Sequence, residues 1–89
     1  MMMLHDRVAV WLDERGVPRR LVYAGERYRV SDAPTVLPAA PINEWTMHPP
    51  TGLGGGWRFQ ATTITGDCRV FDVRIDPARN EWVLVHTYE

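Results

Sequence analysis

The sequence contains no lysine, and all ten of its basic residues are arginine. Without lysine, the chain has neither a Walker-type phosphate loop nor a lysine that forms a Schiff base. The glycine-rich residues 52–56 are therefore not a nucleotide loop. The missing lysine has two interpretations. One is GC-rich codon usage, which we favour, and the other is selection for the planar guanidinium, which suits phosphates and aromatic rings.

Cysteine and serine are nearly as scarce, with Cys68 and Ser31 as their single examples. One cysteine excludes an internal disulfide and a zinc site built from several cysteines, and it favours a reducing compartment. We expect Cys68 to be a partly buried residue at the start of a strand, and Ser31 lies in no nucleophile-elbow pattern. The three histidines lack the spacing of metal ligands. We therefore predict a protein that is not an enzyme, with no catalytic residue, no bound metal and no cofactor.

Long apolar runs are also missing. No stretch approaches the ~20 residues that cross a bilayer, and the N-terminal residues lack the pattern of a signal peptide. We therefore expect a cytoplasmic protein without membrane contact. The chain of 89 residues suits one domain, residues 1–89. Its net charge of −1 lacks the basic field that tight nonspecific binding to a duplex requires.

Short alternating stretches between turn residues predict an all-β fold. The expected strands are residues 7–13, 18–23, 27–30, 57–63, 69–76 and 81–88. Tight turns connect most of them, which indicates an antiparallel meander of about six strands. We expect it to curl into a small SH3-like barrel or a strongly bent sheet. The expected core residues are Trp57, Phe59, Phe71, Ile75, Trp82 and Leu84.

Two strands need further comment. Residues 3–15 also fit a helix that ends at Gly16, but the β-branched Val8 and Val10 favour a strand. In the last strand, strict alternation places four side chains on one face. They are Trp82, Leu84, His86 and Tyr88.

Residues 33–56 differ in character from the rest, because five prolines and four glycines rule out regular structure over most of the segment. We expect one long loop or insertion within the domain. Its residues Trp45, Met47 and His48 form either a tip that docks a protein or a plug at one end of the barrel. We favour the plug.

Strand alternation also places one aromatic residue and four arginines opposite the expected core. These are Trp11, Arg20, Arg27, Arg29 and Arg58. Such a surface suits single-stranded nucleic acid, because the ring stacks on bases and guanidinium groups contact phosphates. The alternative, which we favour, is a solvated surface. In it, the arginines pair with an exposed Asp72, Glu26 and Glu81, and the long segment covers Trp11.

Several short segments resemble a family of small uncharacterised proteins from high-GC actinobacteria. They comprise a hydrophobic strand, an acidic–glycine turn, a basic strand, a GxRYxV hairpin and an aromatic ending. The matching segments are residues 11–20, 25–30, 56–59, 70–76 and 82–89. The ending is also similar to the C-terminal tail of catalytically dead Y-family polymerase homologues. The long proline–glycine segment departs from the pattern, and Glu89 stands where aspartate is usual. The resemblance implies a non-enzymatic domain with an accessory part in DNA damage tolerance.

Together, these observations predict a non-catalytic interaction module. We expect it to dock a protein partner or its own copy through an edge strand or through residues 33–56. The alternative function is weak binding of single-stranded nucleic acid by Trp11 and the surrounding arginines.

Overall fold

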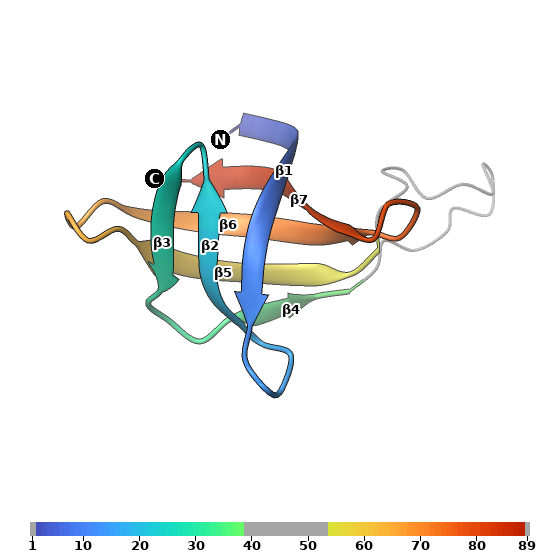
Figure 1. The fold of residues 1–89 in the computed structure, drawn as a ribbon, viewed down its shortest axis with the longest axis horizontal. Coiled ribbons are helices and arrows are strands. Elements are labelled where there is room, and N and C mark those ends of the chain that lie inside the picture. The colour runs from blue at the N-terminus through green and yellow to red at the C-terminus, as the bar shows by residue number, and fades with distance from the viewer. Residues whose placement is uncertain (1, 39–53, 89) are drawn as a thin grey trace.

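The computed structural model describes residues 2–38 and 54–88, with side chains from residue 6 onward. It contains seven antiparallel strands (Figure 1). They are β1 (Met2–Leu12), β2 (Pro18–Tyr23), β3 (Glu26–Val30), β4 (Thr35–Leu37), β5 (Gly56–Thr62), β6 (Cys68–Asp76) and β7 (Glu81–Tyr88). No helix long and apolar enough to span a membrane occurs in the described ranges.

The strands form one sheet in the order β3-β2-β1-β7-β6-β5-β4. Pairing of β3 with β5 closes six of these strands into a barrel, and β4 pairs with β5 beside β3. The predicted meander that curls into a small barrel is therefore confirmed. One strand more is present than expected, because β4 lies inside the segment that seemed unsuited to regular structure.

Strand β1 joins the two halves of the barrel. Its N-terminal part pairs with β7 as far as Val8, and its C-terminal part pairs with β2 from Ala9 onward. In Figure 1, β1, β2 and β3 lie in front of β5, β6 and β7 and cross them. The helix considered for residues 3–15 is wrong, because this segment pairs on both sides as a strand.

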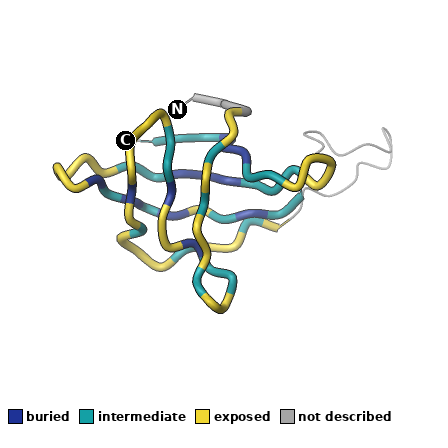
Figure 2. The backbone as a smooth tube through the Cα atoms, in the orientation of Figure 1, coloured by how far each residue is buried: buried dark blue, intermediate teal, exposed yellow. Residues whose placement is uncertain are grey.

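The core lies between these two layers. Phe59, Phe71 and Leu84 are almost completely buried, as expected, and Trp57 and Trp82 pack against them. Two further core residues, Leu21 and Tyr28, come from the β2–β3 hairpin, and the Tyr28 ring meets the Phe71 ring edge-on at 4.8 Å. The expected core residue Ile75 is only half-buried. Exposed residues lie in the turns and also along β1 and β3 (Figure 2).

A bulge in β7 changes the direction of its last side chains. Val73 pairs with Leu84, but the next pair is Asp72 with His86, so Val85 has no partner in β6. Leu84 therefore points into the core, whereas His86 points outward beside Asp72. The expectation that Leu84 and His86 share one face is wrong, because a bulge interrupts strict alternation.

Residues at both ends of the undescribed segment 39–53 are attached to β6. The Arg74 guanidinium donates to the carbonyl of Pro38 at 2.8 Å and to that of Gly54 at 3.2 Å. The backbone of Ile75 adds two hydrogen bonds, accepting from Gly54 N at 2.9 Å and donating to Gly55 O at 3.0 Å. Strand β6 therefore holds the end of β4 next to the start of β5.

The start of β5 requires glycine. A Cβ atom on Gly56 would lie 1.8 Å from the Val73 carbonyl oxygen, so β5 and β6 would have to separate. We expect Gly56→Ala to lower the free energy of unfolding by about 3 kcal/mol, measured by urea denaturation. The matched control is Gly54→Ala, whose Cβ would lie 2.8 Å from the Ile75 Cγ2 methyl group and at an ordinary contact distance of 3.5 Å from the Ile75 carbonyl oxygen. Equal losses in the two variants would contradict this explanation.

Candidate nucleic-acid interface

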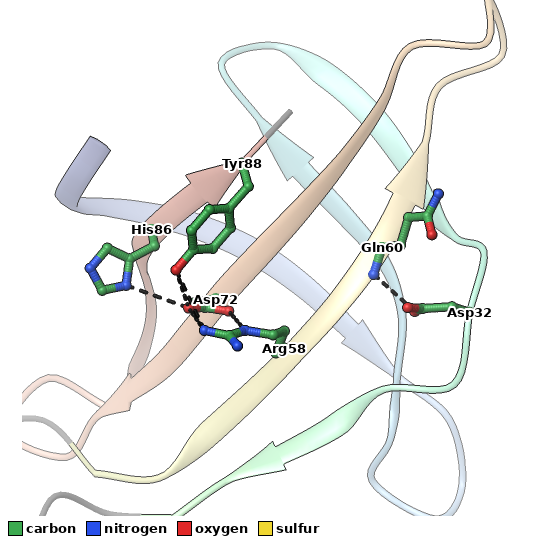
Figure 3. Close-up of polar contacts among 6 residues, drawn as sticks. All are labelled: Asp32, Arg58, Gln60, Asp72, His86 and Tyr88. Carbon is green, nitrogen blue, oxygen red and sulfur yellow. Dashed lines mark hydrogen bonds and ion pairs between the residues drawn. The ribbon is translucent and has the colours of Figure 1, made fainter. Parts of the chain in front are cut away.

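Arg58, one of the five residues expected on a nucleic-acid surface, is engaged elsewhere. It pairs across the sheet with Asp72 of β6, and its Nε and Nη2 atoms donate to the two carboxylate oxygens at 2.7 and 2.8 Å. Tyr88 donates its hydroxyl to Asp72 Oδ2 at 3.2 Å, and His86 Nδ1 lies 3.4 Å from the same oxygen (Figure 3). The cluster joins β5, β6 and β7 on the outside of the barrel.

Asp72 is the buried centre of this cluster, with only 3% of its side chain exposed. It was expected to be an exposed partner for arginine. The partner is confirmed, but the exposure is wrong, because Arg58, His86 and Tyr88 surround the carboxylate. Burial raises the pKa of Asp72, but the hydrogen bonds and charge of Arg58 outweigh burial and hold it below its ordinary value. The same contacts raise the pKa of Arg58.

Three of the other candidates form one row across the sheet. Trp11 of β1 pairs with Arg20 of β2, which pairs with Arg29 of β3, which pairs with Thr62 of β5. Directly opposite side chains are about 5 Å apart, so the indole and the two guanidinium groups are neighbours on the outer face. Arg27 lies two residues from Arg29 on the same face of β3. We call Trp11, Arg20, Arg27 and Arg29 the arginine surface.

The link that follows β3 holds this row in place. Asp32 accepts a hydrogen bond from the backbone N–H of Gln60 at 2.8 Å (Figure 3), and Ser31 N donates to the Gln60 carbonyl at 2.8 Å. The Ser31 and Thr62 hydroxyls are also within hydrogen-bond distance, at 3.1 Å. These bonds keep Arg29 opposite Thr62, so the arginine surface continues onto β5.

The arginines of the barrel divide into two groups by their partners. Four of the ten are engaged: Arg7 lies 3.3 Å from Glu81, Arg69 lies 3.4 Å from Asp67, and Arg58 and Arg74 make the bonds given above. By contrast, Arg20, Arg27 and Arg29 form no ion pair with any residue that the structure describes. Of the expected pairings, the one between Arg58 and Asp72 is therefore confirmed, whereas Glu81 pairs with Arg7. Arg15, Arg19 and Arg79 also lack an ion pair among the described residues.

Trp11 lies at the rim of a groove. The groove has a volume of about 670 Å³ and runs along β1 to the start of β7, where Trp82 and Glu81 form its opposite side. Trp11 is 52% exposed. The expectation that residues 33–56 cover it depends largely on residues 39–53, which lie outside the described part of the chain. An exposed indole at the end of a row of guanidinium groups that have no ion pair among the described residues provides a stacking surface next to positive charge.

The remaining candidates lie apart from this surface. Trp45, Met47 and His48, the expected docking tip or plug, lie outside the described residues. Cys68 is exposed, which contradicts the expected partial burial, and its Sγ accepts a hydrogen bond from the Gln60 amide. Over the described part of the chain, no three His, Cys, Asp or Glu side chains come together as a metal ion would require.

Comparison with known proteins adds no relative: no family model, no curated protein and no solved structure matches the chain.

The Asp72 cluster predicts a pH-dependent contribution to stability. Because folding lowers the pKa of Asp72 from 3.8, its contribution is complete above about pH 4 and is lost as the pH falls through the lowered pKa. We expect Asp72→Asn to lower the free energy of unfolding by roughly 1–2 kcal/mol at pH 7. The difference from wild type should shrink at pH 3, as measured by urea denaturation.

The control for this measurement is Glu14→Gln, which removes an exposed carboxylate in the β1–β2 turn and should leave stability nearly unchanged at both pH values. A deficit of Asp72→Asn that is the same at pH 7 and pH 3 would contradict the assignment.

Proposed function

We propose that this protein is a non-catalytic domain that binds single-stranded nucleic acid on the arginine surface. The observation that carries the proposal is the row Trp11–Arg20–Arg29, an exposed ring and two guanidinium groups in register on three adjacent strands. Neither guanidinium group has a carboxylate partner in the part of the chain that the structure describes. The register places a surface for stacking and two phosphate contacts within one short path.

The nearest acidic side chain on β3 does not cancel this charge. Glu26 is in register with Tyr23 and borders the opposite end of the barrel together with Tyr28, whereas Arg27 and Arg29 alternate to the outer face. The positive charge is therefore local, although the net charge of the chain is −1. Local charge of this size supports weak binding to a flexible strand and not tight binding to a duplex.

Charge and aromatic contacts predict different salt behaviour. Three arginines that neutralise three phosphates of a single strand give a slope of log K against log salt of about −2, because each contributes about −0.7. Stacking of a base on Trp11 adds affinity that salt does not reduce. Both contributions are measurable by fluorescence anisotropy with a labelled oligothymidine at several salt concentrations.

We expect the double variant Arg20→Glu/Arg29→Glu to weaken oligothymidine binding by more than tenfold and to flatten the salt slope. Arg79→Glu is the charge-matched control for each of the single variants Arg20→Glu and Arg29→Glu, because Arg79 is exposed in the β6–β7 turn away from the arginine surface. It should bind as wild type does. Equal weakening by Arg79→Glu would show a general charge effect and would contradict a defined surface.

Replacing the ring tests the stacking contribution separately. Trp11→Ala should weaken binding about tenfold with an unchanged salt slope, since stacking on an aromatic side chain contributes about 1–3 kcal/mol per base. Trp11→Phe should recover part of the affinity. If Trp11→Ala bound oligothymidine as tightly as wild type, the ring would have no part in the site.

A second candidate function, docking of a protein partner or a second copy, is favoured by the edge of the sheet. Strand β4 is the last strand in the sheet order, so one of its edges has no neighbouring strand among the described residues. Val36 at its centre is 61% exposed. Such an edge accepts an added strand, although three residues provide few hydrogen bonds.

If copies of the chain pair through β4, wild type should form dimers that sedimentation measurements detect at high concentration. A charge at the edge opposes such pairing, so Val36→Lys should shift the population towards monomer. Wild type that stays monomeric at every concentration would rule out self-pairing through this strand.

The resemblance noted above supports a biological setting for the first candidate. A single-strand-binding domain similar to the tail of catalytically dead polymerase homologues would serve as an accessory in DNA damage tolerance.

A further inference from the structure

A second hollow, separate from the arginine surface, lies at one end of the barrel. It has a volume of about 250 Å³ and lies between the β2–β3 turn and the β5–β6 turn. Residues from the three strands β2, β3 and β6 and from both turns line it, among them Tyr23, Glu26, Tyr28, Thr65, Asp67 and Arg69. We call this hollow the mouth pocket.

Tyr28 is the deepest polar residue of the mouth pocket. Only 5% of it is exposed, and its hydroxyl forms no hydrogen bond with any residue in the described ranges. Burial raises the pKa of Tyr28, so the phenol stays protonated and remains a donor at neutral pH. The Tyr28 hydroxyl is not one of the fully buried atoms without a partner, so it keeps solvent access where the residue lines the pocket and can donate a hydrogen bond to a ligand there.

The wall opposite Tyr28 is held rigid by its own hydrogen bonds. Thr63 and Asp67 bond twice, from Thr63 N to the Asp67 carbonyl at 2.9 Å and from Asp67 N to the Thr63 hydroxyl at 3.0 Å. The Thr63 hydroxyl also lies 3.0 Å from that of Thr65. The Asp67 carboxylate lies 3.4 Å from Arg69 Nε, so the carboxylate and guanidinium are positioned before any ligand enters.

The charges of the lining indicate what the mouth pocket binds. Two carboxylates, Glu26 and Asp67, face one guanidinium, Arg69, and the excess negative charge disfavours phosphate. The pocket therefore combines carboxylates, which accept hydrogen bonds from N–H groups, with the Arg69 guanidinium and the Tyr28 hydroxyl, which donate to a ring nitrogen or a carbonyl. The rings of Tyr23 and Tyr28 supply flat apolar surface. A volume below the usual 300–1,000 Å³ of drug-sized sites suits one small ring system.

We propose that the mouth pocket binds a nucleobase that carries an exocyclic amino group, such as cytosine or adenine. The amino group donates to Glu26 or Asp67, and a ring nitrogen or carbonyl accepts from Tyr28 or Arg69. The base comes either from a free nucleoside or from a nucleic-acid strand, and both sources share this chemistry. The site does not depend on the arginine surface, because Glu26 and Tyr28 alternate with Arg27 and Arg29 along β3.

The test is titration of the full chain with cytidine, adenosine and uridine, followed by amide NMR spectra. We expect cytidine or adenosine to shift the amide signals of residues 23–28 and 63–69, and uridine, which lacks the amino group, to bind more weakly. Tyr28→Phe should weaken nucleoside binding about 3- to 10-fold, as the loss of one hydrogen bond predicts. Absence of shifts at millimolar nucleoside, or equal binding of uridine, would overturn the proposal.

Two further variants keep the test decisive. Glu26→Gln changes an exposed acceptor without disturbing the core, so a loss of cytidine or adenosine binding in this variant cannot be attributed to misfolding. Arg20→Glu/Arg29→Glu should lose oligothymidine but keep nucleoside binding. If the chain bound nucleosides but no oligonucleotide, the proposed function would be refuted and the nucleobase site in the mouth pocket would be supported. If it bound oligonucleotides but no nucleoside, the nucleobase site would be refuted and the proposed function would be supported. Tighter binding of oligocytidine than of cytidine, reduced by Tyr28→Phe, would identify the strand as the source of the base.

Discussion

The whole arrangement depends on the closure of the barrel between β3 and β5. Only two residue pairs form it, Arg29 with Thr62 and Val30 with Ala61, and Ser31 and Asp32 extend it through their bonds to β5. Without this closure the β2–β3 hairpin would be attached only through β1, and the core residues Leu21 and Tyr28 would lose the layer that covers them. The closing pairs also hold Arg29 on the outer face.

Because β3 is part of the closed barrel, its side chains point alternately to the outer face and to the interior. Arg27 and Arg29 face solvent, whereas Tyr28 contacts Phe71 in the core and Glu26 borders the mouth pocket. Side chains of a strand have a period of two, so a slip of one residue would exchange the charged and apolar sets. The burial of Tyr28 therefore also determines where the two arginines point.

The alternation of apolar and polar residues in the sequence was enough to predict those features that depend on a single strand. It predicted most strands, half of the expected core as fully buried, and the shared direction of Trp11, Arg20 and Arg29. It failed where the result depends on which strands are neighbours. Arg58 pairs with a buried Asp72 through the register of β5 with β6, and His86 turns outward because of the bulge at Val85. Neither the register nor the bulge leaves a local signal in the residues around it.

The bonds of Arg74 have a consequence for how this protein can vary. One side chain of β6 holds the carbonyls of Pro38 and Gly54, so the barrel is complete at the point where the chain leaves it and returns. The entropy of closing a loop rises slowly with length, by about 0.6 kcal/mol for each doubling. Lengthening the chain between these two residues therefore adds little to the entropic cost of closing it.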